Sequence, residues 1–554
     1  MLHNSHDETS PKEPSMLRFR SSKILIGSAV FASTFTDGFM YGIVSAVAAN
    51  RRNRIGDRAD SSQIVPVLPF SLVQRSGMAQ DSIQFWTSML LVIFGISMVF
   101  AAPIAGWITN HSSARQVPLV IGLGMQFAAT FFLMVGTAAW MLVAGRCLQG
   151  LAAGLVYTAG LSLMAETVRR EELGAWMGFA LSGMNFGVLL SPLLAGIVYE
   201  KAGYYAVFAM GLSVIFFNCF LVITMIDKKT ATKWLGKWDP QSHRSTSEGR
   251  STDCSAKVEV EPETSQNNSS KHSDSITDAE SDITLAATDV EIYGTFTPFV
   301  GEDTPLIGNR GLRKNSVFAR RFPKDSILLS SPQIAAAMYG AFINSVLVTS
   351  FDAVLPLFVQ RTFHWDAAAV GGIFLTLTIP SLLGPGIGAL SDRFGPRIIA
   401  LFGFGLCIPA LAFLGIIRHN AIVDVIGLCI LLVLIGMVYS HADMVSLLTL
   451  AIGTGINFFL SPLATDMSIT VEKIDTEYWD VFGSAGACAD TYAIFACAMG
   501  LGTVFGPIVA GVLYHNTNWA ITGGALALIS LSGSIPVVRT LFHLWGNVVL
   551  IGCR

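Results

Sequence analysis

The sequence has little charge for its length. Only 13% of its 554 residues are Asp, Glu, Lys or Arg, about half the share in average soluble domains, and 52% are hydrophobic. With a mean hydropathy of +0.57, the chain has more apolar surface than a soluble fold of this size can bury. This balance argues against a soluble protein and indicates that lipid is its solvent. The net charge of −3 points to no charged partner, and we expect no nucleic acid to bind.

Motifs that carry covalent chemistry are missing too. The eight cysteines form no Cys-x-x-Cys pair and no His/Cys cluster, so we interpret them as small apolar residues rather than disulfides or metal ligands. A nucleotide-binding motif and a nucleophile constellation are also missing, so we predict that the protein is not an enzyme and has no cofactor. Residues 1–22 are polar without an apolar core, so no cleavable signal peptide is expected and the first helix has to target the membrane.

Long apolar runs are what the sequence has instead. Each run is about 20 residues or longer, enough to cross a bilayer as a helix. Twelve runs follow one another, the first starting at Lys23 and the others near 84–108, 117–138, 139–165, 172–198, 203–226, 333–359, 367–389, 397–417, 421–465, 484–513 and 518–541. The predicted fold is therefore an all-α integral membrane protein with twelve transmembrane helices.

A polar stretch divides the runs six from six. Residues 227–330 are rich in Ser and Thr, mixed in charge and without periodicity, so we predict a disordered loop. The predicted layout is a tail at 1–22, one six-helix bundle at 23–226, a second at 331–545, and a tail at 546–554. Lys and Arg gather in the short segments on the side of the N-terminal tail. The positive-inside rule then puts both termini and the loop in the cytoplasm.

The two halves of the chain repeat each other. A charged turn between two apolar runs of the second half has a partial twin 282 positions earlier. The positions that define the two turns are Gly106, Asn110 and Arg115 in the first half and Gly388, Asp392, Arg393, Gly395 and Arg397 in the second. Residues 187–196 likewise recur 315 positions later as 502–511. Such internal repeats are a signature of secondary transporters.

These motifs resemble those of a known family. The second turn, Gly-x-Leu-x-Asp-Arg-x-Gly-x-Arg between two hydrophobic helices, resembles the loop motif of the major facilitator superfamily. Arg146-x-x-Gln149-Gly150 resembles the fourth-helix motif of its proton antiporters. Within the superfamily, Tyr492-Ala-Ile-Phe-Ala and the segment 502–511 are similar to vesicular amine transporters and fungal drug:proton antiporters. The resemblance implies two pseudo-symmetric bundles, alternating access and a proton gradient as the driving force.

The turns are expected to act as a conformational switch. Asp392 can cap a neighbouring helix or pair with arginines at helix ends, which holds one closed state. In the first half the equivalent residue is Asn110, which weakens the contact but still forms hydrogen bonds. Glu166, at the end of the fourth helix, is the expected partner of Arg115. Small residues should let helices approach closely in both halves, at Gly183, Gly187, Pro192, Gly196, Gly502, Gly506, Pro507 and Gly511.

Asp37 is the main candidate for chemistry. It follows Lys23 by 14 residues, about 21 Å along a helix, which is mid-membrane. A carboxyl group there has to be protonated, paired or hydrated, so it marks a functional site unless it only bonds a neighbouring helix. In the resembling amine transporters an aspartate at this place contacts the cationic substrate. Arg146, with Gln149 completing its motif, is expected to promote proton release from this carboxyl group; the alternative is snorkelling to the interface.

The second half departs from the amine transporters. Their tenth and eleventh helices carry acidic residues, where this chain has Asn457 and Ala496. Alignment of the two Leu-Pro pairs puts Asn344 opposite Asp37. The proton machinery is therefore expected in the first half, with Asn344 and Asn457 as polar substrate contacts. Two other acids lie near helix ends and are interpreted as interfacial, Asp352 and Asp490.

Two stretches do not fit the helical pattern. Residues 44–63 place six charged side chains directly after the first apolar run, each costing about 2.5–3.5 kcal/mol at mid-membrane. Without them, the first helix reads as one continuous span. Residues 437–451 similarly overlengthen the tenth run. Our hypothesis is that both are translated introns, because both are encodable with splice signals; the alternative is real insertion loops. Sequencing of the transcript across these codons decides between the two.

From these features we predict a proton-coupled exporter of small organic molecules such as drugs or secondary metabolites. A vacuolar or vesicular amine:proton antiporter is the alternative of the same class. If the charged insert stays in the first helix, a transport-inactive membrane sensor or scaffold is the alternative of another class. The expected partners are the lipid bilayer, protons and one small substrate, with the protein a monomer. We expect the plasma membrane, with the vacuolar membrane as the alternative, and the sequence does not name the cargo.

Overall fold

The structure is a computed structural model. It describes residues 22–50, 83–112, 114–136, 139–226, 323–363, 382–414, 441–478, 482 and 486–552. These residues are almost entirely helical, with no strand among them. They belong to one compact unit made of residues 1–231 and 301–554, whereas the second unit, residues 232–300, lies outside the described part of the chain. Most of the predicted tail at 1–22 and of the loop 227–330 is therefore not tested, whereas residues 546–552 of the other predicted tail continue α21 as a helix.

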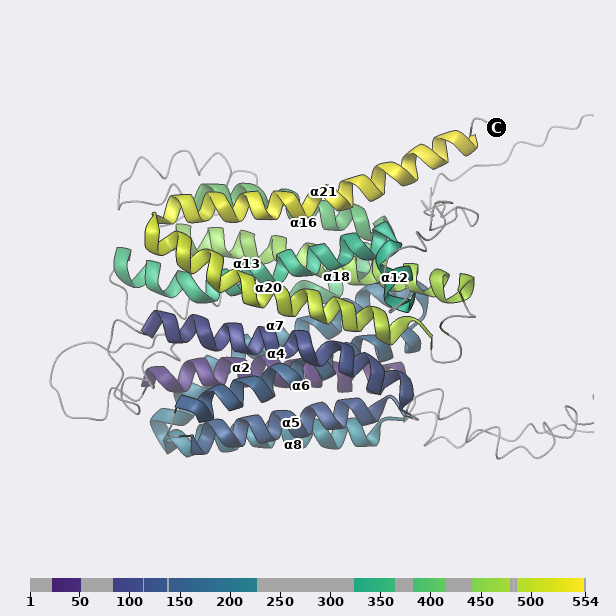
Figure 1. The fold of residues 1–554 in the computed structure, drawn as a ribbon. Helices are drawn as coiled ribbons and strands as arrows, with labels where there is room; N and C mark the ends of the chain where they lie inside the picture. The colour runs from purple at the N-terminus through teal and green to yellow at the C-terminus, as the bar shows by residue number, and fades with distance from the viewer. Residues whose placement is uncertain are drawn as a thin grey trace, which may run out of the picture. The chain divides into compact units, whose positions relative to one another are not determined.

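The helices follow the order of the predicted apolar runs (Figure 1). The first half contains α2 (Lys23–Asn50), α4 (Ile83–His111), α5 (Gln116–Val135), α6 (Ala139–Thr167), the short 3-10 helix η3 (Arg170–Glu172), α7 (Leu173–Ala202) and α8 (Tyr204–Thr224). The second half contains α12 (Pro323–Ser330), α13 (Pro332–Phe363), α15 (Gly384–Phe394), α16 (Pro396–Leu414), α18 (His441–Glu477), α20 (Cys488–Asn516) and α21 (Trp519–Gly552).

Each of the twelve predicted runs contains at least part of one of these helices. Within the described residues, nine helices are long and apolar enough to cross a membrane. The runs predicted at 367–389 and 421–465 are only partly described, by α15 and α18. The all-helical membrane fold is thus confirmed, while the number of twelve spans stays a prediction.

The helix α12 corrects one predicted boundary. Residues 323–330 were assigned to the disordered loop, but they form a helix directly before α13. Ile327 and Leu328 are buried in the main hydrophobic core, and Lys324 lies 5.8 Å from the centre of the Phe482 ring. Two adjacent apolar side chains are too few to give a visible period in a Ser-rich stretch, so the sequence pattern did not reveal this short helix.

Glycines allow the closest helix contacts in both halves. A β-carbon on Gly187 of α7 would collide with the backbone of Phe35 on α2. At the corresponding place in the second half, a β-carbon on Gly502 of α20 would collide with the Phe342 carbonyl group on α13. The repeated glycine segments therefore produce the same packing twice, α7 on α2 and α20 on α13.

Other members of the glycine segments vary in their surroundings. Gly183 packs on α2 in the way of Gly187, and Gly506 packs on α13 in the way of Gly502. Pro507 is buried inside α20, whereas Gly511 has open space around it. The side-chain surroundings of Pro192 and Gly196, both within α7, lie outside the described part of the structure.

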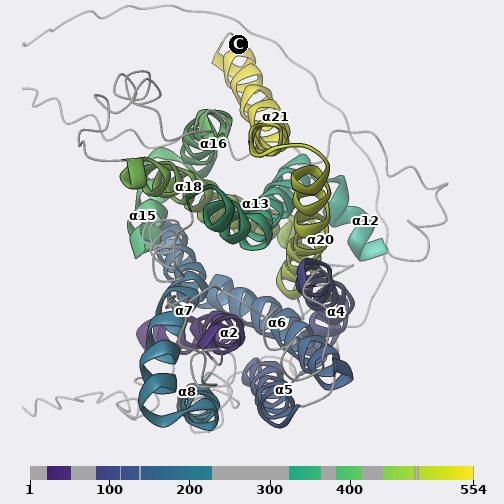
Figure 2. The same ribbon diagram turned by 90° about the vertical axis from the view of Figure 1, so that its left-hand side faces the viewer.

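The halves meet mainly along two pairs of helices, α7 with α15 and α4 with α20 (Figure 2), with smaller contacts of α6 with α20 and of α7 with α18. A β-carbon on Gly388 of α15 would collide with the Gly174 carbonyl group of α7. On the other pair, a β-carbon on Gly106 of α4 would lie 2.9 Å from the Ala493 β-carbon of α20. Both glycines belong to the charged turns, so we call this end of the helices the turn end. The two turns thus lie at the contacts between the halves.

The two predicted inserts are described only in part. The helix α2 continues beyond Ile43 to Asn50, but its membrane-crossing part ends at Ile43. Residues 51–63 lie outside the described residues. In the second insert, residues 441–451 form the start of α18, and residues 437–440 are not described. The intron hypothesis stays a prediction.

Candidate functional site

Two helices of the first half bring the predicted polar residues together inside the protein. Asp37 and Tyr41 are one turn apart on α2, and Arg146 and Gln149 are one turn apart on α6. Asp37, Arg146 and Gln149 are all buried, with 4%, 1% and 1% of their surfaces exposed. A buried guanidinium group is stable only where its charge is compensated. These four side chains therefore form a polar cluster inside the protein, which is the candidate functional site.

Arg146 is the centre of this site. Its Nη1 donates a hydrogen bond of 3.0 Å to Gln149 Oε1, and its guanidinium group lies 5.4 Å from the centre of the Tyr41 ring. Arg146 also lies within electrostatic range of Asp37. Because the contacts hold the guanidinium group inside the bundle, the snorkelling alternative is wrong for this residue.

The site reaches across to the second half of the chain. The Tyr41 hydroxyl group donates a hydrogen bond of 3.0 Å to Asp352 Oδ2 on α13. The sequence indicated only that Asp352 lies near the end of its apolar run, and the span of α13 does end at Leu355. Its partner was not visible, because a contact between helices of different halves leaves no periodic signal. An acidic residue within an apolar run was the one available sign.

Two further candidates are less well connected. Asn344 is buried on α13 with its Oδ1 unpartnered among the described residues, and no contact described here joins it to Asp37 or Arg146. Asn457 is part of α18, but its side chain lies outside the described part of the structure. Arg146 Nε also has no hydrogen-bond partner among the described residues. Within the described part of the chain, the site thus keeps an unpartnered cationic donor, and the unpartnered acceptor of Asn344 lies on α13 without a contact that joins it to the site.

This arrangement suits binding and proton exchange. Asp37 and Asp352 can each hold a proton or face a cation, and Arg146 can compensate a carboxylate. The described residues contain no group of three or more His, Cys, Asp or Glu side chains that could hold a metal ion. A polar organic molecule with a positive charge or several hydrogen-bonding groups matches these side chains.

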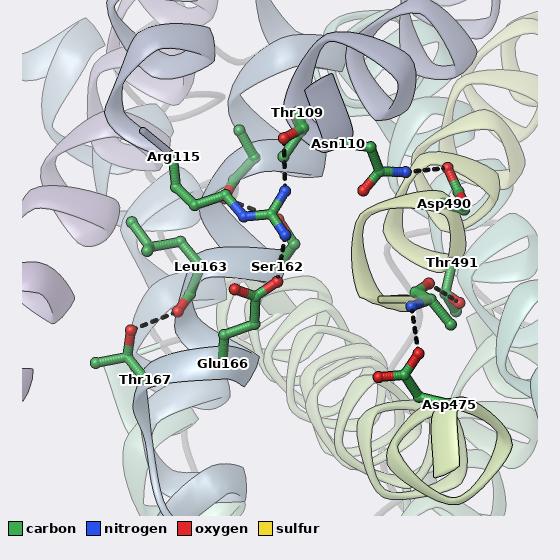
Figure 3. Close-up of polar contacts among 12 residues, drawn as sticks. Thr109, Asn110, Arg115, Ser162, Leu163, Glu166, Thr167, Asp475, Asp490 and Thr491 are labelled. Carbon is green, nitrogen blue, oxygen red and sulfur yellow. Dashed lines mark hydrogen bonds and ion pairs between the residues drawn. The ribbon is translucent and has the colours of Figure 1, made fainter. Parts of the chain in front are cut away.

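At the turn end, one arginine of each turn pairs with an acidic residue of its own half. Arg115 Nη2 donates to Glu166 Oε1 on α6 at 2.8 Å, as predicted, and Arg115 Nη1 donates to the Thr109 carbonyl oxygen at 2.6 Å (Figure 3). In the second half, Arg397 Nε donates to Asp466 Oδ2 on α18 at 3.0 Å. Both ion pairs are largely buried. Each pair fixes a turn to the fourth helix of its own half.

The equivalent turn residues Asn110 and Asp392 reach the other half instead. Asp392 accepts hydrogen bonds from the backbone N–H groups of Gly174 and Ala175, at 2.8 and 3.0 Å. It therefore caps the N-terminus of α7, one of the two roles predicted for it. Asn110 Nδ2 donates to Asp490 Oδ1 in the first turn of α20 at 2.6 Å (Figure 3). Asn110 thus forms the hydrogen bond expected of it.

The Asp392 carboxyl group is half-buried between the helices. Burial raises the pKa of Asp392 above its ordinary value, although the two N–H groups of α7 counteract this. The nearby Glu172 carboxylate adds to the rise. Glu172 has a lowered pKa itself, because Lys23 and Trp176 donate hydrogen bonds to it. The pKa of Asp392 at the start of α7 therefore reflects burial and Glu172, which raise it, and two N–H groups, which lower it.

Two remaining turn residues have simple local roles. Gly395 ends α15 with a φ of 91°, a conformation that favours glycine over residues with a β-carbon. Arg393 is exposed at the end of the same helix, where its positive charge faces the negative end of the helix dipole.

Comparison with known proteins identifies this architecture. The sequence model of the Major Facilitator Superfamily matches residues 30–454. The chain belongs to this superfamily. It is 27% identical over 517 residues to the uncharacterized MFS-type transporter C18.02 of Schizosaccharomyces pombe, covering 93% of this chain and 95% of that protein.

Two partial matches add relatives with named activities. The rat vesicular acetylcholine transporter is 33% identical over 131 residues, 24% of each chain. The multi-drug resistance efflux pump PmrA of Streptococcus pneumoniae is 27% identical over 168 residues, covering 30% of this chain and 41% of that protein. A crystal structure of the human organic anion transporter MFSD10 superposes with a TM-score of 0.56 and 12% identity, covering 93% and 99% of the two chains. This last likeness shows the fold alone.

Membership of the Major Facilitator Superfamily settles the general class. The protein is a multi-pass membrane transporter that works in a lipid bilayer on a small substrate, and it is not an enzyme. Within this family fold, the structure brings Asp37, Arg146 and Gln149 together and adds Tyr41 and Asp352, which sequence reasoning missed.

Proposed function

We propose that the protein exports small organic molecules, such as drugs or secondary metabolites, in exchange for protons. The observation that carries this proposal is the line of buried and half-buried side chains from Asp37 and Arg146 through Tyr41 to Asp352. It connects two acidic side chains, one from each half of a transporter. A proton gradient then serves as the driving force, and no cofactor is needed.

The physical argument concerns the cost of a buried charge. An ionised Asp37 at 4% exposure is stable only while Arg146 or a cationic cargo compensates it. When the cargo leaves, protonation removes the uncompensated charge. Binding of cargo and binding of a proton therefore compete at this carboxyl group, and this competition couples the two fluxes.

The export direction is supported by the similarity to the pneumococcal efflux pump over 168 residues. The positive-inside rule supports a topology with both termini in the cytoplasm, because Lys and Arg concentrate beside the N-terminal tail and at the turns. We place the protein in the plasma membrane, as a monomer, with the switch role assigned to the two turns.

A second candidate is an amine:proton antiporter of a vacuolar or vesicular membrane. The acids Asp37 and Asp352 on opposite halves favour a cationic cargo. The 33% identity to the vesicular acetylcholine transporter over 131 residues also supports it. The lack of acids at Asn457 and Ala496 weakens it, because the resembling amine transporters carry them there.

The test uses purified full-length protein in proteoliposomes with an imposed pH gradient. Ethidium and other fluorescent organic cations serve as cationic probes, and neutral dyes of similar size as the comparison. We expect uphill accumulation of at least one probe, and its abolition by a protonophore. Accumulation of cations alone, with acetylcholine as a competitor, selects the amine alternative. Binding without any flux contradicts the proposal and favours the transport-inactive sensor.

A further inference from the structure

Two glutamines face each other between α5 and α6, behind the Arg146 site. On α5, Gly122 packs against Leu155 and Val156 of α6, and on α6, Gly145 packs against Leu133 and Ala129 of α5. These contacts define one contact stripe on each helix, with members three or four residues apart. The α5 stripe is 122, 126, 129 and 133, and the α6 stripe is 145, 149, 152 and 156.

Gln126 and Gln149 lie on these stripes at the same height. The helices run in opposite directions, so the contacts near 122 and near 145 fix the register between them. Interpolation between these contacts places residue 126 opposite the α6 turn that contains the stripe residues 149 and 152. Both side chains are buried, with 2% and 1% of their surfaces exposed. Register and burial together thus put the two amide groups on facing stripes of α5 and α6 inside the first half.

Three polar atoms of this pair have no protein partner among the described residues: Gln126 Oε1, Gln126 Nε2 and Gln149 Nε2. The orientation of the Gln149 amide is fixed, because Arg146 only donates hydrogen bonds and therefore requires Gln149 Oε1. The Gln149 Nε2 group is then turned away from Arg146. Gln149 Nε2 and the Gln126 amide therefore form no direct hydrogen bond with each other.

We propose that an ordered water molecule binds between these two amide groups and bridges Gln126 and Gln149. Buried polar groups are nearly always hydrogen-bonded, and a buried water typically bonds to about three polar atoms, the number available here. Through this bridge, Gln126 acts as a positioning residue. It holds the Gln149 amide, and Gln149 holds the Arg146 guanidinium group. This consequence rests on the proposed proton-coupled function, whereas the water site itself does not.

The water site is tested by a double-mutant cycle on unfolding. Purified full-length protein is unfolded in mixed micelles by SDS, and the unfolding equilibrium constant is compared for wild type, Gln126→Leu, Gln149→Leu and the double variant. We expect Gln126→Leu to raise this constant about fivefold, because it leaves Gln149 Nε2 unsatisfied. In the Gln149→Leu background the same change should have less than about a twofold effect.

Without a bridging water, the effect of Gln126→Leu on the unfolding equilibrium constant should have the opposite sign. If no water bridges the pair, Gln126→Leu removes a buried unsatisfied amide and lowers the unfolding constant in both backgrounds, which overturns the proposal. A direct bond between the two amides would also couple them. An experimental map separates these cases: a density peak within hydrogen-bond distance of both amides is expected, and amides in direct contact contradict the water.

The positioning role needs a transport readout. We expect Gln126→Leu to reduce gradient-driven accumulation of the probe about fivefold while substrate counterflow stays within about twofold of wild type. An equal loss of both activities indicates a general structural defect and contradicts the positioning role.

Thr158→Val is the matched control, since Thr158 is a buried residue of α6 on another face, and its hydroxyl group has no partner among the described residues. It should leave both activities unchanged. If wild type accumulates no probe, the proposed function fails while the unfolding cycle still decides the water site.

Discussion

The two charged turns occupy equivalent places in the two halves, but they carry their charge differently. In the second half, the acid is on the turn: Asp392 caps the N-terminus of α7. In the first half, the turn provides the amide of Asn110, and the acid is Asp490 on the receiving helix α20. In both cases one acidic group lies at the start of a helix of the other half, where the helix dipole favours it.

This difference between the turns shows which contacts are the same in both halves and which are not. The arginine pairs, Arg115 with Glu166 and Arg397 with Asp466, keep the same roles in both halves. The contact between halves needs an acid near the helix start, whichever partner provides it. Losing the acid should weaken the two contacts by different amounts, however. Asp392 accepts hydrogen bonds from two backbone N–H groups, and no other side chain of the described residues is in place to accept them. We therefore expect the α7–α15 contact to be the more sensitive of the two.

The largest effect is expected from a steric comparison of the two turn glycines. Gly388→Ala drives a methyl group into the Gly174 backbone, whereas Gly106→Ala puts one 2.9 Å from the Ala493 β-carbon, which is a milder overlap. We expect Gly388→Ala to weaken its contact by about 2–3 kcal/mol and Gly106→Ala by about 1 kcal/mol. Distances between spin labels on α7 and α15, and on α4 and α20, measure the open populations. Equal opening in both variants would contradict the asymmetry.

The next effect concerns the cap itself. Asp392→Ala removes the acceptor for two backbone N–H groups of α7, at a cost of about 1–2 kcal/mol. Because this residue acts on the equilibrium between conformations, transport should slow by up to about tenfold while substrate affinity changes little. Flux and binding of the same probe are measured in parallel. Normal flux with altered substrate choice would show that Asp392 has a different role.

A smaller effect is expected when the first turn is given the acid of the second. Asn110 now donates a hydrogen bond to Asp490. Asn110→Asp replaces this bond by two carboxyl groups that lie side by side. The repulsion should weaken the α4–α20 contact by about 1 kcal/mol. Adding Asp490→Asn restores one acid and one amide, in reversed places, and should recover most of the contact. If the double variant is worse than the single, acid position matters and the two turns are not interchangeable.

The smallest effect is a pH dependence of the α7–α15 contact. The pKa of Asp392 is raised in the contact, so the closed form binds a proton more readily than the open form. Stability from this group is therefore fully present below the ordinary aspartate pKa and is lost as pH rises through the raised value. Spin-label distances at several pH values should show closure on acidification. Glu172→Gln should shift this transition to lower pH, because a nearby negative charge is removed; an unchanged transition would exclude that neighbour as a cause.

The sequence predicted those features that repeat along the chain, and those in which a charged side chain needs a partner or burial at a known depth of a helix. The order of the helices followed from apolar runs, and Arg115 with Glu166 followed from opposite charges at one expected end of the membrane. Burial of Asp37 and Arg146 followed from their depth along a helix. These are properties of single elements or of repeated ones, and therefore leave a pattern along the chain.

Contacts between the halves left no such pattern. The bond from Tyr41 to Asp352 joins residues 311 positions apart, and Tyr41 reads as an ordinary apolar residue of its run. The hydrogen bond between Asn110 and Asp490, which puts the acid on α20 instead of on the turn, was likewise not visible, because Asp490 alone looks like an interfacial residue. The pairing of α5 and α6 that sets Gln126 against Gln149 needs their register, which periodicity does not contain.

The central claim is that Asp37 exchanges the proton that drives transport, and the Asp37→Asn variant tests it most directly. Asparagine keeps the size and hydrogen bonding of the side chain but has no proton to exchange in this range. In proteoliposomes with an imposed pH gradient, accumulation of the probe should fall to the level of protein-free vesicles. Substrate counterflow without a gradient should continue, because alternating access does not need the charge. If the variant still concentrates the probe when the gradient is applied, Asp37 is not the coupling site and the mechanism is wrong.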